Sequence, residues 1–554
     1  MPSFQNLIRI VLLLIAPLII FGCSDQEPAM SAPIPSEASS PQRPNFLLIT
    51  TDDMGYTDLG AFGGADIPTP NLDRLALEGI RLTNFHVNVS CAPTRSMLMS
   101  GTGNHEAGMG SQQAFAAFAG QPGYEQRITD RVVTIPERMQ AAGYHTYMAG
   151  KWHLGGSAGV VQPGERGFER SFALLPGGWD HYRLPPGSEI PSLGSALDVP
   201  YSEDGELLQD LPEDFYSTNA YIDKMIGYLE SNVASDQPFF AWLAPTAPHW
   251  PLQVLPEWKD RFVGDYDEGY EALCHARQLG AWAAGVLPEG ADLSICPEIA
   301  TPWNELSEDE KALNRRTMEL YTAMVAHLDF ELGRLLEYLE QSGQMENTYI
   351  IYHNDNGPEG SEIFDNRSQM ARIDNSLENL GNRNSWVNVG QGWADAQSAP
   401  FREEKGSQFE GGIRVPAFIL PPNSYETGRI SSSFLTVMDV MPTMMELAGI
   451  EESSYPQRGQ LPIRGKSFAS LLENTETVVH AADEAIALDH AGLSFLMEGD
   501  WKIMRRVDAD NWQLYNTAED PNELEDLAQQ NPQKLNDLVI KYQAHADDIG
   551  ILRR

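Results

Sequence analysis

The chain has 554 residues, more than a single hydrophobic core usually serves, so we expect a large domain and a smaller one. Its 78 acidic residues outnumber the 37 basic ones and give a formal net charge of -41. A surface of that sign repels phosphate backbones and excludes a nucleic-acid-binding protein. It also implies that a site for an anionic ligand must gather basic side chains locally, because they are scarce elsewhere.

The N-terminal segment has the composition of an export signal followed by a tether. Arg9 precedes an apolar run at residues 10–21, too short to span a membrane but suited to a signal peptide over residues 1–22. The run leads into Cys23 in a pattern that resembles bacterial lipoprotein cleavage sites, so we expect lipidation and membrane anchoring there. Ordinary secretion is the alternative. Residues 23–44 form a predicted flexible tether, and the mature protein would be periplasmic or at the cell surface.

Short apolar runs alternate with helical patterns along the rest of the chain. The predicted strands occupy residues 45–51, 144–149, 239–244, 349–352 and 415–420. The predicted helices occupy residues 72–78, 133–142, 317–342 and 434–448. This alternation predicts an α/β fold with a large doubly wound sheet, mixed but mostly parallel, flanked by helices. Ligands of such sheets bind beyond the carboxyl ends of the strands.

The pattern of predicted elements changes after residue 455. Short strands separated by turns are predicted at residues 485–488, 493–497, 501–505 and 513–515, and a final helix at residues 531–545. We therefore expect a main domain over residues 45–455. A small C-terminal α+β domain with an antiparallel sheet would occupy residues 456–554.

Two of the four cysteines, Cys274 and Cys296, lie outside any recognisable motif. An exported protein meets oxidising conditions, in which the two cysteines can form a disulfide that closes a surface segment between them. Two buried thiols are the alternative, and the spacing does not decide between them. Neither cysteine is assigned a catalytic role.

Acidic and amide side chains directly follow two of the predicted strands. Asp52 and Asp53 follow the first strand, and Asp355 and Asn356 follow a later one. Alone, an Asp-Asp pair is typical of a turn or a helix cap. Parallel strands bring their carboxyl ends to one edge, however, and a set of oxygen ligands favours a hard divalent cation. We expect Ca²⁺, with Mg²⁺ as the alternative.

Cys91 stands at the predicted N-terminus of a helix, because Pro93 suits the first helical turn. That end of a helix attracts anions through its free N–H groups. Arg95 lies one turn further on the same side and adds a planar cation. From the local pattern alone, a buried cysteine that only packs is the alternative.

The sequence pattern Cys-x-Pro-x-Arg at residues 91–95 is followed by an apolar run and Ser-Gly. This pattern resembles the signature of the type I sulfatases of the alkaline-phosphatase-like superfamily. Gly-Lys-Trp-His-Leu-Gly at residues 150–155 resembles the second signature of that family. Residues 101–110 and 269–287 are similar to its bacterial arylsulfatase branch. The resemblance implies a sulfuric ester hydrolase in which Cys91 becomes formylglycine (3-oxoalanine). A formylglycine-generating enzyme or an anaerobic sulfatase-maturing enzyme would then be a partner.

The resemblance also implies the ligands of the cation and the groups around the nucleophile. The implied metal ligands are Asp52, Asp53, Asp355, Asn356 and the modified Cys91. Arg95 and Lys151 would stabilise the hydrated aldehyde, whose oxygen attacks sulfur with Asp355 as base. A geminal diol is useful because a serine would be trapped as a stable sulfate ester.

Three further residues are implied around the ester. His249 and Lys405 would hold the sulfate and assist departure of the alcohol, and His153 would deprotonate the remaining hydroxyl to expel sulfate. Hydrolysis of a sulfate ester needs such charge neutralisation and a proton for the departing oxygen. Residues 357–399 form a predicted long polar loop, which we expect to line the substrate mouth.

Other functions are compatible with these residues. A phosphate or phosphonate ester hydrolase of the same superfamily would use the same cation and basic groups. A silent surface lipoprotein would retain only the fold. Among sulfatases, an aryl sulfate, a steroid sulfate and a sulfated sugar all suit this core, because specificity lies in loops. We expect a small sulfate ester as substrate; the oligomeric state and the leaflet of anchoring are left open.

Overall fold

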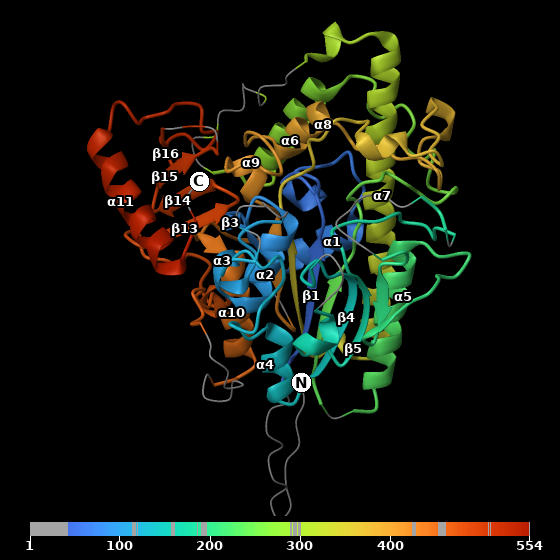
Figure 1. Cartoon of the computed structure of the whole chain (residues 1–554), viewed down its shortest axis with the longest axis horizontal. Helices are drawn as coiled ribbons and strands as arrows, with labels where there is room; N and C mark the ends of the chain where they lie inside the picture. Colours follow the sequence, from blue (N-terminus) through green and yellow to red (C-terminus); the bar gives the residue numbers. More distant parts are fainter. Residues whose placement is uncertain are drawn as a thin grey trace, which may run out of the picture. The chain divides into compact units, whose positions relative to one another are not determined.

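Figure 1 shows the computed structural model of the chain. It describes residues 43–552 except residues 113–117, 119, 157–160, 186, 190–196, 236, 289–290, 292–295, 297–300, 424–427, 452–460, 508 and 510. The predicted signal peptide, Cys23 and nearly all of the tether lie outside the described residues, as does the predicted boundary at residue 455. In the described part, no helix has both the length and the hydropathy that a membrane crossing requires.

A ten-stranded sheet forms the centre of the fold. Its strands are β1 (Asn45–Thr51), β2 (Ile80–Leu82), β4 (His145–Lys151), β5 (Arg170–Leu174), β6 (Tyr201–Glu203), β7 (Glu206–Leu207), β8 (Phe239–Ala244), β9 (Thr348–Asn354), β10 (Ala417–Leu420) and β11 (Arg429–Ser431). Their order is β11-β2-β10-β9-β1-β8-β4-β5-β6-β7. The central strands from β9 to β5 run parallel, whereas β10 pairs antiparallel with β9 and β2. The predicted mixed, mostly parallel sheet is confirmed.

Helices cover both faces of this sheet, because its strands carry apolar side chains on both sides. In β1, Leu47 and Ile49 join one hydrophobic cluster, and Phe46 and Leu48 join the other. The first cluster includes α1 (Pro70–Glu78), α5 (Ser217–Asn232) and α7 (Glu308–Gln341). The second includes α2 (Cys91–Ser100), α4 (Ile135–Ala141) and α10 (Val440–Leu447). Figure 1 shows α5 and α7 on the opposite side of the strands from α2 and α10.

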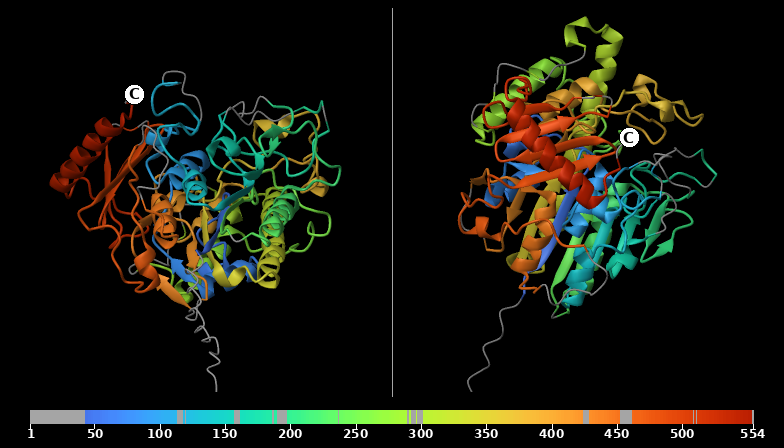
Figure 2. Two further views of the ribbon diagram at one scale, coloured as in Figure 1. Left: turned by 90° about the horizontal axis from the view of Figure 1, so that it is seen from below. Right: turned by 60° about the vertical axis from the view of Figure 1, so that its left-hand side comes forward.

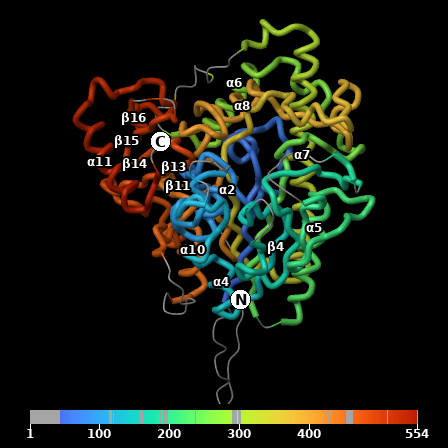
Figure 3. The backbone as a smooth tube through the Cα atoms, in the orientation of Figure 1, coloured from blue at the N-terminus to red at the C-terminus, as the bar shows by residue number. Residues whose placement is uncertain are grey.

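A separate antiparallel sheet lies near the C-terminus, with strand order β13-β14-β15-β16. It consists of β13 (Ala485–His490), β14 (Leu493–Glu498), β15 (Trp501–Arg505) and β16 (Gln513–Asn516), and α11 (Pro532–Ile549) follows it. One face, with Phe495 and Met504, packs into the second cluster of the main fold, and the other, with Leu496 and Ile503, packs on α11. Figure 2 shows α11 lying across these strands, and Figure 3 traces the chain through them. The predicted α+β element is confirmed, and its status as a separate domain stays a prediction.

The segment at residues 434–448 is not the single helix that its apolar pattern predicts. β12 (Leu435–Thr436) pairs instead with β3 (Phe85–His86), and a 3-10 turn (Val437–Asp439) precedes α10. The Asp439 carboxylate accepts a hydrogen bond from the Thr436 backbone N–H at 2.7 Å. This capping contact starts the helical turns after Thr436 and leaves the preceding residues extended.

The segment at residues 357–399 is not one polar loop. It ends in α8 (Gln391–Ser398), and the side chains of Trp386 and Trp393 are 0% exposed. The Trp393 indole donates to the Asn314 carbonyl at 2.8 Å. The tryptophans therefore anchor a segment whose other residues are mostly polar. The remaining short helices are α3 (Asn104–Ala107) and α9 (Glu410–Ile413).

Cys274 and Cys296 form a disulfide, the first of the two alternatives that the sequence leaves open. Cys274 lies on α6 (Tyr270–Ala283), and the two Cα atoms are 6.0 Å apart. The thiol of Cys91, by contrast, is free and buried. The bridge therefore ties α6 to the segment that follows it and leaves Cys91 available for other chemistry.

Candidate active site

The adjacent strands β1 and β9 end at the same edge of the large sheet, with Thr51 in register with Asn354. Asp52 and Asp53 follow β1, and Asp355 follows β9. The Asp355 backbone N–H donates to the Thr51 carbonyl at 3.1 Å. Asp52 and Asp355, which are distant in the sequence, therefore meet at one edge, where ligands of parallel sheets bind.

The polar side chains at this edge are buried, and some of their oxygen atoms have no hydrogen-bond partner. Asp52 and Asp355 are 0% exposed, and Asp53 is 1% exposed. Among the described residues, Asp355 Oδ1 and Asn356 Oδ1 find no donor, although Asn356 Nδ2 donates to Asp53 Oδ1 at 2.7 Å. Buried acceptors without a partner are unfavourable. A divalent cation would pair with them, so this oxygen set fits a Ca²⁺ or Mg²⁺ ion.

The electrostatics of the carboxylates favour a cation as well. Burial raises the pKa of Asp52, and the adjacent Asp355 carboxylate raises it further. Burial also raises the pKa of Asp53 to about 7, against the opposing charge of Lys405. Ionising these groups in the metal-free protein is therefore unfavourable, and a divalent cation at this edge would reverse that effect.

Cys91 is the first residue of α2, and Ser90 is its N-cap. Its Sγ lies 3.5 Å from Asp52 Oδ1. Burial, followed by the Asp355 charge, raises the pKa of the Cys91 thiol, so the unmodified side chain is neutral and a poor nucleophile. The possible ligand atoms of Asp52, Asp53, Cys91 and His249 all lie within 4.8 Å of one another, and this group could hold a metal ion.

Arg95 and Lys151 approach the same carboxylates from α2 and β4. Arg95 Nε donates to Asp355 Oδ2 at 2.8 Å, and Arg95 Nη1 donates to the Lys151 carbonyl at 2.7 Å. Lys151 Nζ donates to Asp52 Oδ2 at 2.6 Å. Arg95 Nη2 lies 3.9 Å from Asp52 Oδ2 and donates no hydrogen bond within the described part of the chain. This guanidinium group therefore keeps N–H donors for an anionic ligand.

Lys405 and two histidines lie at the same edge. Lys405 Nζ donates to both Asp53 oxygens at 2.7 and 2.9 Å, and His249 Nε2 lies 3.6 Å from Asp53 Oδ2. His153 follows β4 in the left-handed region, at a φ of 55°. Burial, followed by the charge of Lys151, lowers the pKa of both histidines well below its usual value. Both rings are therefore neutral at neutral pH.

Two glycines that the sequence analysis missed make room for these rings. A Cβ atom on Gly177 would lie 2.5 Å from His153 Cε1, and one on Gly178 would lie 2.8 Å from His249 Cε1. Real Cβ atoms do not approach other atoms so closely. A Gly-Gly pair in a sequence signals a close approach of the backbone, but it does not reveal what approaches.

Glu359 is a further residue at the site; the sequence predicts only that residues 357–399, which include it, line the substrate mouth. Its Oε2 lies 3.2 Å from Lys405 Nζ and accepts a hydrogen bond from the Trp250 indole at 3.3 Å. Lys405 therefore bridges Asp53 and Glu359. Burial acts to raise the pKa of Glu359, but the charge of Lys405 lowers it below its usual value.

The mixed sheet with helices on both faces, and the buried ionic site at its carboxyl edge, define an α/β protein whose functional site lies beyond the ends of its parallel strands. A model of the family described as Sulfatase matches residues 44–450. The chain belongs to this family and is a sulfuric ester hydrolase.

Two relatives that are similar in sequence agree with this assignment. An arylsulfatase of Klebsiella aerogenes is 38% identical over 443 residues, which cover 79% of this chain and 93% of that protein. An uncharacterized sulfatase of Schizosaccharomyces pombe is 39% identical over 528 residues, 92% of this chain and 95% of that protein. The structure of Ps i-CgsB in complex with k-i-k-neocarrahexaose matches with a TM-score of 0.65 and 24% identity, over 91% of this chain and 93% of that one. The phosphonate monoester hydrolase of Agrobacterium radiobacter matches with a TM-score of 0.52 and 19% identity, over 92% of this chain and 95% of that one. These two structural matches establish the fold alone.

Proposed function

We propose that the protein is an exported arylsulfatase that works with formylglycine at position 91 and one divalent cation. The observation that carries the proposal is the contact of Cys91 with Asp52, at 3.5 Å, beside the buried cations Arg95 and Lys151. A cysteine in this surrounding is neutral and needs conversion before it can attack. The hydrate of formylglycine would supply the missing nucleophile.

The oxygen atoms of Asp52, Asp53, Asp355 and Asn356 would hold the cation, with Ca²⁺ as the expected ion and Mg²⁺ as the alternative. When bound, the cation would neutralise negative charge on the ester and favour ionisation of the attacking hydroxyl. Arg95 would direct its free Nη2 donor, and Lys151 its ammonium group, at the nucleophile and the sulfate. The modified residue 91 would complete the ligand set.

The other end of the ester would meet His249 and Lys405. Lys405 Nζ is a charged donor, so it would give a hydrogen bond or proton to the departing oxygen. His249 lies on the same side of Asp53 and would assist it. His153 is neutral and its Nδ1 has no partner among the described residues, so it would take the proton of the remaining hydroxyl as sulfate leaves.

Two measurements test this proposal. Peptide mass spectrometry of protein from its native host should find formylglycine at position 91, and an unmodified thiol there would remove the proposed nucleophile. The ratio of kcat/KM for an aryl sulfate and the matching aryl phosphate should favour the sulfate. A preference for the phosphate, or for a phosphonate monoester, would support the alternative hydrolase named above.

A sulfatase specific for a sulfated carbohydrate is the second candidate. It is favoured by the 26% identity, over 88% of this chain, to an N-acetylglucosamine-6-O-sulfatase of Bacteroides thetaiotaomicron. The 38% identity to an arylsulfatase over most of the chain favours an aryl sulfate instead. A panel of aryl, steroid and sugar sulfates assayed with the matured enzyme would rank the candidates by kcat/KM.

We also propose that residues 1–22 direct export and that Cys23 is lipidated. This localisation agrees with the disulfide between Cys274 and Cys296, because such bonds persist in oxidising compartments. Replacing Cys23 by Ser should release the protein from the membrane fraction. Release of the unaltered protein into the soluble fraction would instead support ordinary secretion.

A further inference from the structure

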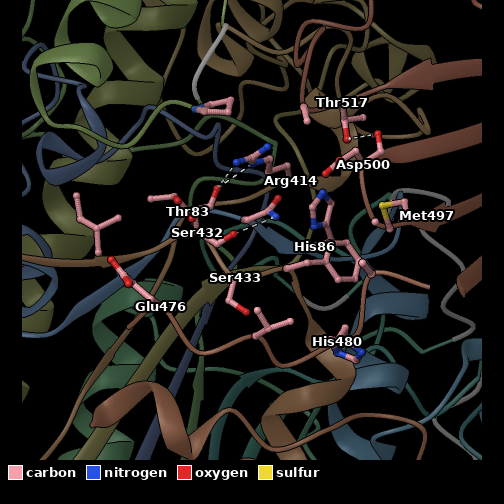
Figure 4. Close-up of a pocket in the computed structure, with 18 of the residues that line it drawn as sticks. Thr83, His86, Arg414, Ser432, Ser433, Glu476, His480, Met497, Asp500 and Thr517 are labelled. Atoms are coloured by element: carbon pink, nitrogen blue, oxygen red, sulfur yellow. Dashed lines mark hydrogen bonds between the residues drawn. The ribbon is translucent and has the colours of Figure 1, made fainter. Parts of the chain in front are cut away.

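A cavity of about 990 Å³ lies where the antiparallel C-terminal sheet meets the main fold. Its lining comes from β3 and the residues before it, from the residues after α6, from α9 and Arg414, from the residues around β11 and β12, from residues 475–482, and from the residues that follow β14 and β16. None of the residues assigned to the catalytic edge lines it. We call it the accessory pocket, and Figure 4 shows its side chains.

His86 lines the accessory pocket and keeps one ring nitrogen without a partner. Its Nε2 lies 2.9 Å from Glu410 Oε2. Burial opposes ionisation of Glu410, but the charge of Lys502 holds the pKa of that carboxyl well below its usual range. An ionised carboxylate accepts hydrogen bonds, so Nε2 carries a proton. Nδ1 has no partner among the described residues, although His86 is only 3% exposed.

A ring nitrogen without a hydrogen-bond partner in the described part of the chain, in a residue of the lining, favours a ligand with hydroxyl groups. In Figure 4 the His86 ring lies among the labelled side chains of the pocket. A hydroxyl can donate to Nδ1 when the ring is neutral and accept from it when the ring is protonated. A buried polar atom without a partner is unfavourable, so binding a hydroxyl there would stabilise the pocket.

The cations that line the pocket already have partners. Arg414 donates from Nε and Nη2 to the Thr83 carbonyl at 2.8 and 2.6 Å, and its Nη1 lies 3.5 Å from Glu410. His480 Nε2 lies 2.9 Å from Asp439 Oδ2. A sulfate, phosphate or carboxylate would have to displace these contacts, so the pocket is not built for an anion.

The remaining lining combines hydroxyl groups, exposed carboxylates and apolar surface. Ser432, Ser433, Thr475, Thr477 and Thr517 supply the hydroxyls. Glu476 and Asp500 are exposed acceptors in the same lining. The Phe434 ring packs on His86 at a centroid distance of 5.1 Å. Hydroxyls and carboxylates pair with the hydroxyls of a polyol, and apolar surface covers its C–H groups.

We propose that the accessory pocket binds a neutral sugar unit. A sugar hydroxyl pairs with His86 Nδ1, and others pair with the hydroxyls of Ser433 and Thr477 and with the Asp500 carboxylate. The cavity volume lies at the upper end of small-molecule sites, so roughly one or two sugar rings fit. Sugar binding in the accessory pocket is separate from ester hydrolysis and does not depend on which sulfate ester the catalytic site cleaves.

Saturation-transfer NMR on the full chain tests the proposal. The probes are the methyl glycosides of glucose, galactose, mannose and fucose, each up to roughly 50 mM, because a single sugar ring binds with millimolar affinity. Thr477→Trp fills the pocket, and Thr301→Trp is the matched control at an exposed threonine that does not line it. His86→Phe keeps an aromatic ring but removes Nδ1 together with Nε2 and its contact with Glu410, and thermal unfolding verifies that each variant is folded.

We expect saturable binding of at least one glycoside, weakened at least about tenfold by Thr477→Trp and by His86→Phe but not by Thr301→Trp. Inorganic sulfate should not displace the sugar, because sulfate belongs to the catalytic site. The proposal is wrong if none of the probes binds, if binding survives both pocket substitutions, or if sulfate competes with it. None of these outcomes depends on formylglycine or on the natural ester.

Discussion

The catalytic site and the accessory pocket contain the same kinds of side chain, but they pair their charges differently. At the catalytic edge, Asp355 Oδ1 and a nitrogen of Arg95 are buried and find no hydrogen-bond partner in the described part of the chain. In the accessory pocket, the nitrogens of Arg414 and His480 lie beside oxygen atoms of the protein, whereas Nδ1 of His86 has no hydrogen-bond partner among the described residues. The first arrangement suits a cation together with an anion, and the second suits an uncharged ligand.

This comparison shows that an arginine and a histidine in a cavity do not by themselves indicate an anion site. What matters is whether their charges are already matched by the protein. The formal net charge of -41 makes the gathering of basic side chains at the catalytic edge more informative, because acidic residues outnumber basic ones in this chain. The predictions below separate the two regions, beginning with the largest effect.

Removing Sγ at position 91 should abolish hydrolysis without affecting the accessory pocket. For Cys91→Ala we expect kcat/KM on para-nitrophenyl sulfate to fall by at least about 10⁴-fold, because the nucleophile is absent. Steady-state kinetics measures the loss, and an unchanged melting temperature serves as the control. Activity within tenfold of the unaltered enzyme would mean that the catalytic centre lies elsewhere.

Chelation should also separate the two regions. EDTA should lower kcat by about 10³-fold, because the buried carboxylates then have no cation to bind and the ester charge is not neutralised. Addition of Ca²⁺ or Mg²⁺ should restore activity, and glycoside binding should not change throughout. Loss of glycoside binding with EDTA would contradict the separation of the sites.

The increase in melting temperature that Ca²⁺ causes should depend on pH. Burial raises the pKa of Asp53 from 3.8 to about 7 in the metal-free protein, so folding takes up a proton there. The stability that the protonated carboxyl contributes is present at low pH and is lost as the pH rises through about 7. The stabilisation by Ca²⁺ should therefore be larger at about pH 8 than at about pH 5. Equal stabilisation at both values, measured by calorimetry, would argue against cation binding at Asp53.

Crowding His153 should produce a smaller loss of activity. In Gly177→Ala the new Cβ would lie 2.5 Å from His153 Cε1, so we expect kcat to fall by about 10- to 100-fold as the ring moves. Gly227→Ala on α5 is the matched control, because its Cβ meets nothing within 4 Å. The control should keep full activity and gain up to about 1 kcal/mol in free energy of unfolding. Equal activity of both variants would show that the position of His153 is not critical.

Substitutions in the accessory pocket should have the smallest effect on hydrolysis. Thr477→Trp and His86→Phe should change kcat/KM for para-nitrophenyl sulfate by less than about twofold, because no residue is shared with the catalytic edge. The same variants should lose glycoside binding. A tenfold fall in kcat/KM with unchanged melting temperature would reveal coupling between the two regions, and the comparison would then need revision.

The sequence by itself determined the local elements of the catalytic edge. The predicted strand at residues 45–51 coincides with β1, and the one at residues 239–244 coincides with β8. Buried strands form apolar runs of this length, so their ends can be read from the residues. Asp52 and Asp355 each follow such an end, and parallel pairing then brings them to one edge.

The tertiary structure alone decided the features that depend on distant partners. The apolar segment at residues 434–448 predicts one helix, but pairing with β3 draws its first residues into a strand. The pairing of Cys274 with Cys296 and the closeness of Gly177 to His153 also depend on chain segments that meet only in the folded state. The accessory pocket is the clearest case, because its walls come from segments spread over most of the chain. Sequence patterns record what each segment prefers locally, whereas a cavity exists only where several segments pack without filling the space between them.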